Sequence, residues 1–248
     1  MRYAIPGQVA DTRYRLTCTT ALERDSAGRR DTQQLSGEAQ VVVRLRRRSG
    51  GGFSATGQVI GYAVQSALST TAIAIDSLRF DAVLDSLALR VALQPPLVNE
   101  CDRPESGALS LVRDLLIRVP ASLAIGDQWR DSTVALVCRS NLPMIVRTVA
   151  DYVVTDSAQG DEGVLLVIRR TSHTRVEGNV SSPWRAVSVT GIGSATLEAR
   201  VSVQSGAVER VESTSTLTLA VTDRTTPASV RAQQVIQRVQ LTGVKVAR

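Results

Sequence analysis

Residues 194–204, SATLEARVSVQ, alternate between apolar and polar side chains. The apolar positions are Leu197, Ala199, Val201 and Val203. Successive side chains of a strand point to opposite faces, so this period of two indicates a strand with one core face and one solvated face. The alternation resumes at 208–221 after the turn signal QSGA, and the two stretches together predict a hairpin.

The same pattern recurs along most of the 248 residues. It appears in QVIQRVQLTGVKV, in PMIVRTVADYVVT before the polar turn DSAQGD, and in the stretches on either side of the polar segment 24–37. Residues 77–93 partly fit a helical face, but they fit a hairpin as well, and the hairpin is favoured. Aromatic residues make up only 3 % of the chain and hydrophobic residues 43 %, so the core must consist mainly of Val, Leu, Ile and Ala. The predicted fold is all-β: an antiparallel, strongly curved sheet, or a partly open barrel or sandwich.

One stretch departs from the period of two. SGALSLVRDLLIRVP, residues 106–120, carries apolar residues at helical spacing, with Ser106 as a candidate N-cap and Pro120 beyond the far end. It predicts the main helix of the chain, at about 106–118. No apolar run approaches eighteen residues, so no helix that crosses a membrane is expected.

A corner is expected directly after this helix, in AIGDQWRDS, residues 124–132. Gly126 and Asp127 form a turn signal, and Trp129 follows them at the start of the next strand. The favoured interpretation is that Trp129 covers the end of the core. The alternative is that its ring stacks on a ligand.

The corner has a counterpart near the start of the chain. IPGQVADTRYRL at 5–16 resembles AIGDQWRDSTVAL at 124–136, with a glycine turn, a glutamine and a polar lead into a strand. We therefore predict a single β-rich domain over 1–248, which could be built from two similar halves, 1–105 and 121–248, joined by the helix.

These two stretches also carry a resemblance to a protein family. RYAIPGQVADTRYRL, then VPASLAIGDQWRD, then the Gly191-Ile192-Gly193 segment in the late strands resemble a loosely defined group of uncharacterised bacterial exported proteins. The resemblance implies a β-rich protein of the periplasm, cell envelope or exterior, and no catalytic residues. The chain opens MRYAIPGQ, without the leader of that group, so a cytoplasmic location is the alternative.

The net charge is +6, and all but one of the 29 basic residues are arginines. They are scattered except in RLRRR, where Arg44, Arg46, Arg47 and Arg48 form a candidate surface for an anion, an anionic membrane surface or an acidic partner. Aromatic residues for stacking bases are scarce there, so a nucleic acid is not the expected partner. A solvated strand end is the plainer interpretation of the run.

Three cysteines are present, and none lies in a Cys-x-x-Cys pair. If the protein is exported, a disulfide between Cys101 and Cys138 is predicted, which would stabilise the fold by about 4 kcal/mol in the chain-entropy model. Cys18 lies within a strand pattern and is expected to behave as a small core residue. Three free thiols are the alternative.

The remaining sequence patterns do not predict a catalytic, nucleotide-binding or metal-binding site. His173 is the only histidine, no Gly-x-Ser-x-Gly is present, and GIGSAT lacks a third glycine. The acids Asp156, Asp161 and Glu162 could hold Ca²⁺, but a solvated hairpin loop is favoured. No catalytic residue, metal or cofactor is therefore predicted.

Two classes of function follow. The first is a non-enzymatic exported protein that binds a ligand or a protein partner. The second is a structural subunit of a cell-envelope or surface assembly, and a hydrolase is a distant third. An interior pocket lined by Val and Leu would favour the first class, whereas an exposed apolar patch or an unpaired sheet edge would favour the second.

Overall fold

The computed structural model describes residues 1–26, 28–47, 52–66, 73–84, 89–94, 111–139, 142–182, 185–226 and 229–246. Nearly all of them lie in strands, so the all-β prediction is confirmed. The strands are β1 (Arg2–Ala4), β2 (Gln8–Ser26), β3 (Arg29–Arg47), β4 (Phe53–Ser66), β5 (Ile73–Leu84), β6 (Leu89–Gln94), β7 (Ser122–Ala124), β8 (Gln128–Arg139), β9 (Leu142–Gly160), β10 (Gly163–Ser182), β11 (Arg185–Ser202), β12 (Val208–Thr226) and β13 (Ser229–Val246).

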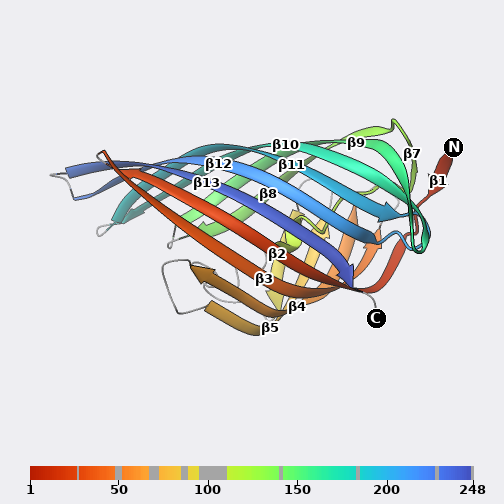
Figure 1. The fold of residues 1–248 in the computed structure, drawn as a ribbon. Coiled ribbons are helices and arrows are strands. Elements are labelled where there is room, and N and C mark those ends of the chain that lie inside the picture. The colour runs from red at the N-terminus through yellow and green to blue at the C-terminus, as the bar shows by residue number, and fades with distance from the viewer. Residues whose placement is uncertain are drawn as a thin grey trace.

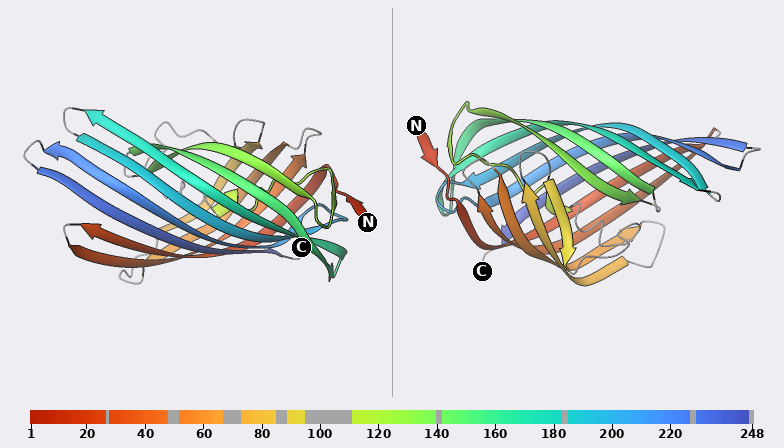
Figure 2. Two further views of the ribbon diagram at one scale, coloured as in Figure 1. Left: turned by 90° about the horizontal axis from the view of Figure 1, so that it is seen from above. Right: turned by 180° about the vertical axis from the view of Figure 1, so that it is seen from behind.

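Eleven strands form one antiparallel sheet in the order β6-β5-β4-β3-β2-β13-β12-β11-β10-β9-β8. In this sheet each strand pairs with its neighbour in sequence, except where β13 pairs with β2 and so joins the two halves of the chain. The sheet curls until the edge strands β6 and β8 approach each other. Figures 1 and 2 show the result, an elongated, partly open barrel. The pairing of β5 with β6 confirms the hairpin predicted at 77–93.

The strands are longer than the sequence patterns suggested. Residues 24–37 were expected to separate two strands, but β2 and β3 continue through this polar segment and turn only near Gly28, which has a φ of 78°. That expectation was wrong because the two strands stay in register through the polar residues, with Arg24 opposite Asp31 and Ser26 opposite Arg29. A hairpin whose two faces are both solvated needs no apolar alternation.

The core lies on the inner, concave face of the sheet. Along β11, Leu197, Ala199 and Val201 are buried at alternate positions, as the alternation predicted. They belong to one cluster with Val41 of β3 and Leu166 of β10. This cluster fills one end of the curled sheet.

Residues 111–123, here called the inner segment, pass through that cluster between β6 and β8. Val112 and Ile117 are 0 % and 2 % exposed. At its far end β7 pairs with β1, and Ile5 N–H donates to Ala121 O. The inner segment therefore closes the core end of the barrel from inside.

The helix expected at about 106–118 is found only in part. Residues 106–110 lie outside the described residues, 111–113 are helical, 114–115 form a turn, and 116–120 are not helical. The predicted end at 118 is therefore wrong. Leu116, Ile117 and Val119 are all buried, so the segment is surrounded by core rather than presenting one apolar face. Pro120 in addition disfavours helical geometry at Val119. No helix among the described residues is long and apolar enough to cross a membrane.

The two similar stretches occupy similar places. In each half a three-residue strand, β1 or β7, is followed by a short turn and a long strand, β2 or β8, and the two short strands pair with each other. This arrangement fits the suggestion of two related halves, which stays a prediction.

Candidate functional site

At the end of the barrel away from the core cluster, the inner face lines a cavity of about 500 Å³, here called the trough cavity. Its walls come from β9, β11, β12, β13 and β2, which are brought together by the curl of the sheet. The lining residues are Arg24, Ser26, Leu142, Met144, Arg185, Val187, Val189, Leu219, Val221, Asp223, Gln233 and Val235.

The walls of the trough cavity are aliphatic. The lining residues Leu142, Met144, Val189 and Leu219 belong to a second buried cluster, separate from the core cluster. Register explains the packing, because Val189 lies opposite Val221 on the next strand. These aliphatic side chains form one part of the lining, beside the polar residues that complete it. The cavity has a volume typical of small-molecule sites, which run from about 300 to 1,000 Å³.

A glycine on the neighbouring strand leaves the space that the Met144 side chain occupies in the wall. Gly178 of β10 is directly opposite Met144 of β9. A Cβ at position 178 would come within 2.7 Å of Met144 Cγ and 2.8 Å of Pro143 O. Any larger residue at this position would therefore displace Met144 from the wall.

The polar lining residues lie toward the strand ends. Arg24 and Ser26 end β2, Arg185 begins β11, and Asp223 and Gln233 lie near the turn between β12 and β13. We call these five residues the mouth of the trough cavity. Apolar walls with a few polar groups at one end are typical of sites that bind small molecules.

A polar belt lies between the core cluster and the trough cavity. An Arg170 guanidinium N–H donates to Asp114 Oδ1 at 2.6 Å, and Ser213 Oγ donates to Asp114 Oδ2 at 2.8 Å. Asp114 belongs to the inner segment, and its partners lie on β10 and β12. Burial opposes the charge of Arg170, but Asp114 and Tyr152 outweigh it and raise the pKa of Arg170. The hydrogen bonds of this polar belt therefore connect the inner segment to strands β10 and β12 of the barrel.

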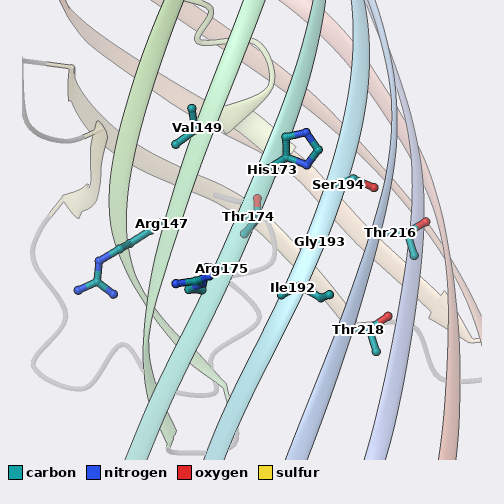
Figure 3. A pocket seen from close by; sticks show the side chains of 10 residues that line it. All are labelled: Arg147, Val149, His173, Thr174, Arg175, Ile192, Gly193, Ser194, Thr216 and Thr218. Carbon is teal, nitrogen blue, oxygen red and sulfur yellow. The ribbon is translucent and has the colours of Figure 1, made fainter.

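A second hollow, of about 700 Å³, lies on the outer face over β9 to β12. Figure 3 shows its lining side chains, Arg147, Val149, His173, Thr174, Arg175, Ile192, Gly193, Ser194, Thr216 and Thr218. Ile192 is 69 % exposed there, and Leu136 on the outer face of β8 is 74 % exposed. The outer face over these strands therefore carries apolar side chains in contact with solvent.

The outer hollow contains the histidine of the chain, His173. His173 lies opposite Ser194 in register, but no hydrogen bond joins them in the part of the chain that the structure describes. The nearby Asp151 carboxylate accepts two hydrogen bonds from Arg130, which lower its pKa. Asp151 is thus occupied as the partner of Arg130.

The arginine run is divided between the two faces of β3. Arg44 is exposed and makes a bidentate pair with Asp11, and Arg46 is exposed as well. Arg47 instead points inward and donates to Pro6 O and Gly206 O, while burial lowers its pKa to about 10. The prediction of a shared surface is therefore wrong for Arg47, because the alternation of a strand separates neighbouring side chains. Arg48 lies outside the described residues.

Trp129 lies at the predicted corner. Its ring is half-buried and stacks on Tyr152, with the ring centroids 5.0 Å apart, and its N–H donates to Arg118 O. Trp129 also packs against the core cluster. Stacking on a ligand stays a prediction, though Tyr152 already occupies one face of the indole.

The predicted disulfide stays a prediction, because Cys101 lies outside the described residues. Cys138 is in β8, opposite Pro143. Cys18 is a free thiol that is half-buried against the core cluster. Of the acids near 156–162, Glu162 pairs with Lys245 at 2.8 Å, and Asp156 accepts from the Ser157 N–H.

Comparison with known proteins adds little to this geometry. No family model matches the sequence, and no curated protein does. Among solved structures, OccK2 (OpdF) of Pseudomonas aeruginosa in complex with glucuronate is similar, with 8 % identity and a TM-score of 0.31 over 99 % of this chain and 100 % of that one. A second structure of OccK2 (OpdF) gives 7 % identity and a TM-score of 0.30 over all of both chains.

Proposed function

We propose that this chain is a non-enzymatic binding protein that holds an apolar small molecule in the trough cavity. One observation supports the proposal above the others: a cavity of about 500 Å³ in which leucine, valine and methionine side chains form an apolar patch beside a polar mouth. Apolar surface that a ligand covers is removed from water, which stabilises the complex by about 25 cal/mol per Å² before the costs of association.

We also propose that the protein acts outside the cytoplasm, in the periplasm, the cell envelope or beyond. The resemblance of its Pro-Gly-Gln start and its Gly-Asp-x-Trp corner to exported proteins supports this location. The proposed binding function requires no metal or cofactor.

A substitution that fills the trough cavity tests the binding proposal. Val221 lines the cavity and is only partly buried, so the ring in Val221→Trp would extend into the space a ligand needs. We expect the affinity for the neutral apolar dye N-phenylnaphthylamine, measured by fluorescence titration, to fall by about tenfold or more. Thr222→Trp is the matched control, because it places the same ring on the opposite face of β12. Equal affinities in the two variants would argue against binding in the trough cavity.

The second candidate function is a structural subunit of a larger assembly at the cell envelope or surface. Outward-facing apolar side chains support it. Leu136 lies opposite Ile145 across β8 and β9, both are exposed, and Ile192 is exposed two strands further on. Exposed apolar residues grouped on one face are typical of surfaces that contact another protein.

This candidate predicts self-association through the outer face. We expect light scattering across a concentration series to show dimers or larger species for the native chain. Changing both Leu136 and Ile192 to Lys should weaken the association by about tenfold or more, since a buried unpaired ammonium is costly. Thr216→Lys, a polar position in the same outer hollow, adds one charge as the control. A native chain that stays monomeric throughout would count against this mode of assembly.

A further inference from the structure

We infer that the ligand of the trough cavity is an amphipathic anion. Its apolar body lies against the aliphatic walls, and its carboxylate or phosphate lies at the mouth beside Arg24. This inference rests on the proposed binding function and adds the chemical class of the ligand.

The register places the cationic group next to the apolar walls. Leu219 of β12 lies opposite Val235 of β13, and Val235 lies opposite Arg24 of β2. All three line the trough cavity. A molecule lying across these strands would therefore meet two aliphatic side chains and then a guanidinium.

Arg24 is an arginine that lines the trough cavity without an acidic partner among the described residues. Arg44, Arg130 and Arg170 each make an ion pair, and others do likewise. The side chain of Arg24 has no ion pair and no hydrogen bond among the residues that the structure describes. Its guanidinium therefore keeps all its donors available at the mouth of the trough cavity.

Three other charged groups lie near the mouth. Arg185 and Asp223 also line the cavity, and both already have interaction partners. Asp31 lies opposite Arg24 on β3 but does not line the cavity. Among the lining residues, Arg24 is the charged group without a partner, so an anionic end group fits beside it better than a cationic one.

A guanidinium recognises carboxylate and phosphate through the same pair of parallel hydrogen bonds. The structure therefore assigns an anion with an apolar chain, and the assay separates the two head groups. We propose calorimetric titration of the full chain with laurate, dodecyl phosphate and dodecanol, all below the concentrations at which they form micelles. The three share one alkyl chain and differ only in the head group.

We expect at least one of the two anions to bind about tenfold more tightly than dodecanol, with a preference that falls as salt increases. Arg24→Gln should remove that preference, so that the two anions bind no more tightly than dodecanol. Arg15→Gln is the matched control, because Arg15 is an exposed arginine on the opposite face of the same strand. Whichever anion binds more tightly identifies the head group.

Failure of the inference and failure of the proposed function give different results. If dodecanol binds as tightly as both anions and Arg24→Gln changes nothing, the inference is overturned and the binding function stands. The same holds if Arg15→Gln weakens anion binding as much as Arg24→Gln does. If no alkyl ligand binds and N-phenylnaphthylamine does not bind either, the proposed function itself is overturned.

Discussion

Replacing Asp114 with alanine is expected to lower the free energy of unfolding by about 3–5 kcal/mol, near the lower end of this range because the carboxylate is partly exposed. Asp114 accepts hydrogen bonds from both Arg170 and Ser213. The side chain of Arg170 is only 14 % exposed, so without Asp114 its charge would stay buried and uncompensated. Ser213 would lose its acceptor as well. Urea unfolding followed by circular dichroism measures the change.

The control is an ion pair of the same kind on the outer face. Arg130 and Asp151 are also 2.6 Å apart, but their side chains are 71 % and 46 % exposed. Water solvates either charge when its partner is removed, so we expect Asp151→Ala to destabilise the protein far less than Asp114→Ala. Similar losses for the two variants would show that the polar belt does not hold the inner segment in place.

The period of two predicted most of the sheet. It placed alternate residues such as Leu197 and Ala199 on the core face, and it favoured the β5–β6 hairpin over a helix. These assignments depend only on neighbouring residues in one strand, so the sequence carries them directly. The corner at Trp129 was predictable for the same reason, from the adjacent Gly126 and Asp127.

Features that depend on the curl of the sheet could not be read in this way. The walls of the trough cavity come from residues as distant as Leu142 and Val235, and alternation says nothing about how strongly the sheet bends. Alternation also does not show where the inner face is filled by the inner segment and where it stays open. The sequence placed Arg24 in a polar segment between two predicted strands, because both faces of β2 are polar near its end. Its place at the mouth follows only once β2 and β13 are paired.

Trp129→Ala tests whether the tryptophan is a structural corner or a ligand platform. The indole stacks on Tyr152 with an angle of 3° between the ring planes, and it donates to Arg118 O of the inner segment. Alanine would remove the stacking, the buried part of the ring and the donor to that carbonyl. We therefore expect a loss of about 3 kcal/mol in unfolding free energy, at the lower end for a tryptophan because the ring is only half-buried.

Trp129→Phe separates the two contributions and provides the control. Phenylalanine can keep the stack on Tyr152 but leaves Arg118 O without its donor, so we expect a smaller loss of about 1 kcal/mol. Both are measured by urea unfolding with circular dichroism, together with N-phenylnaphthylamine titration of the folded variants. Trp129 packs against the core cluster and not in the trough cavity, so dye affinity should be unchanged in both. If stability were unchanged while dye binding was lost, Trp129 would be a residue that stacks on a ligand, and the binding site would lie at the core end of the barrel.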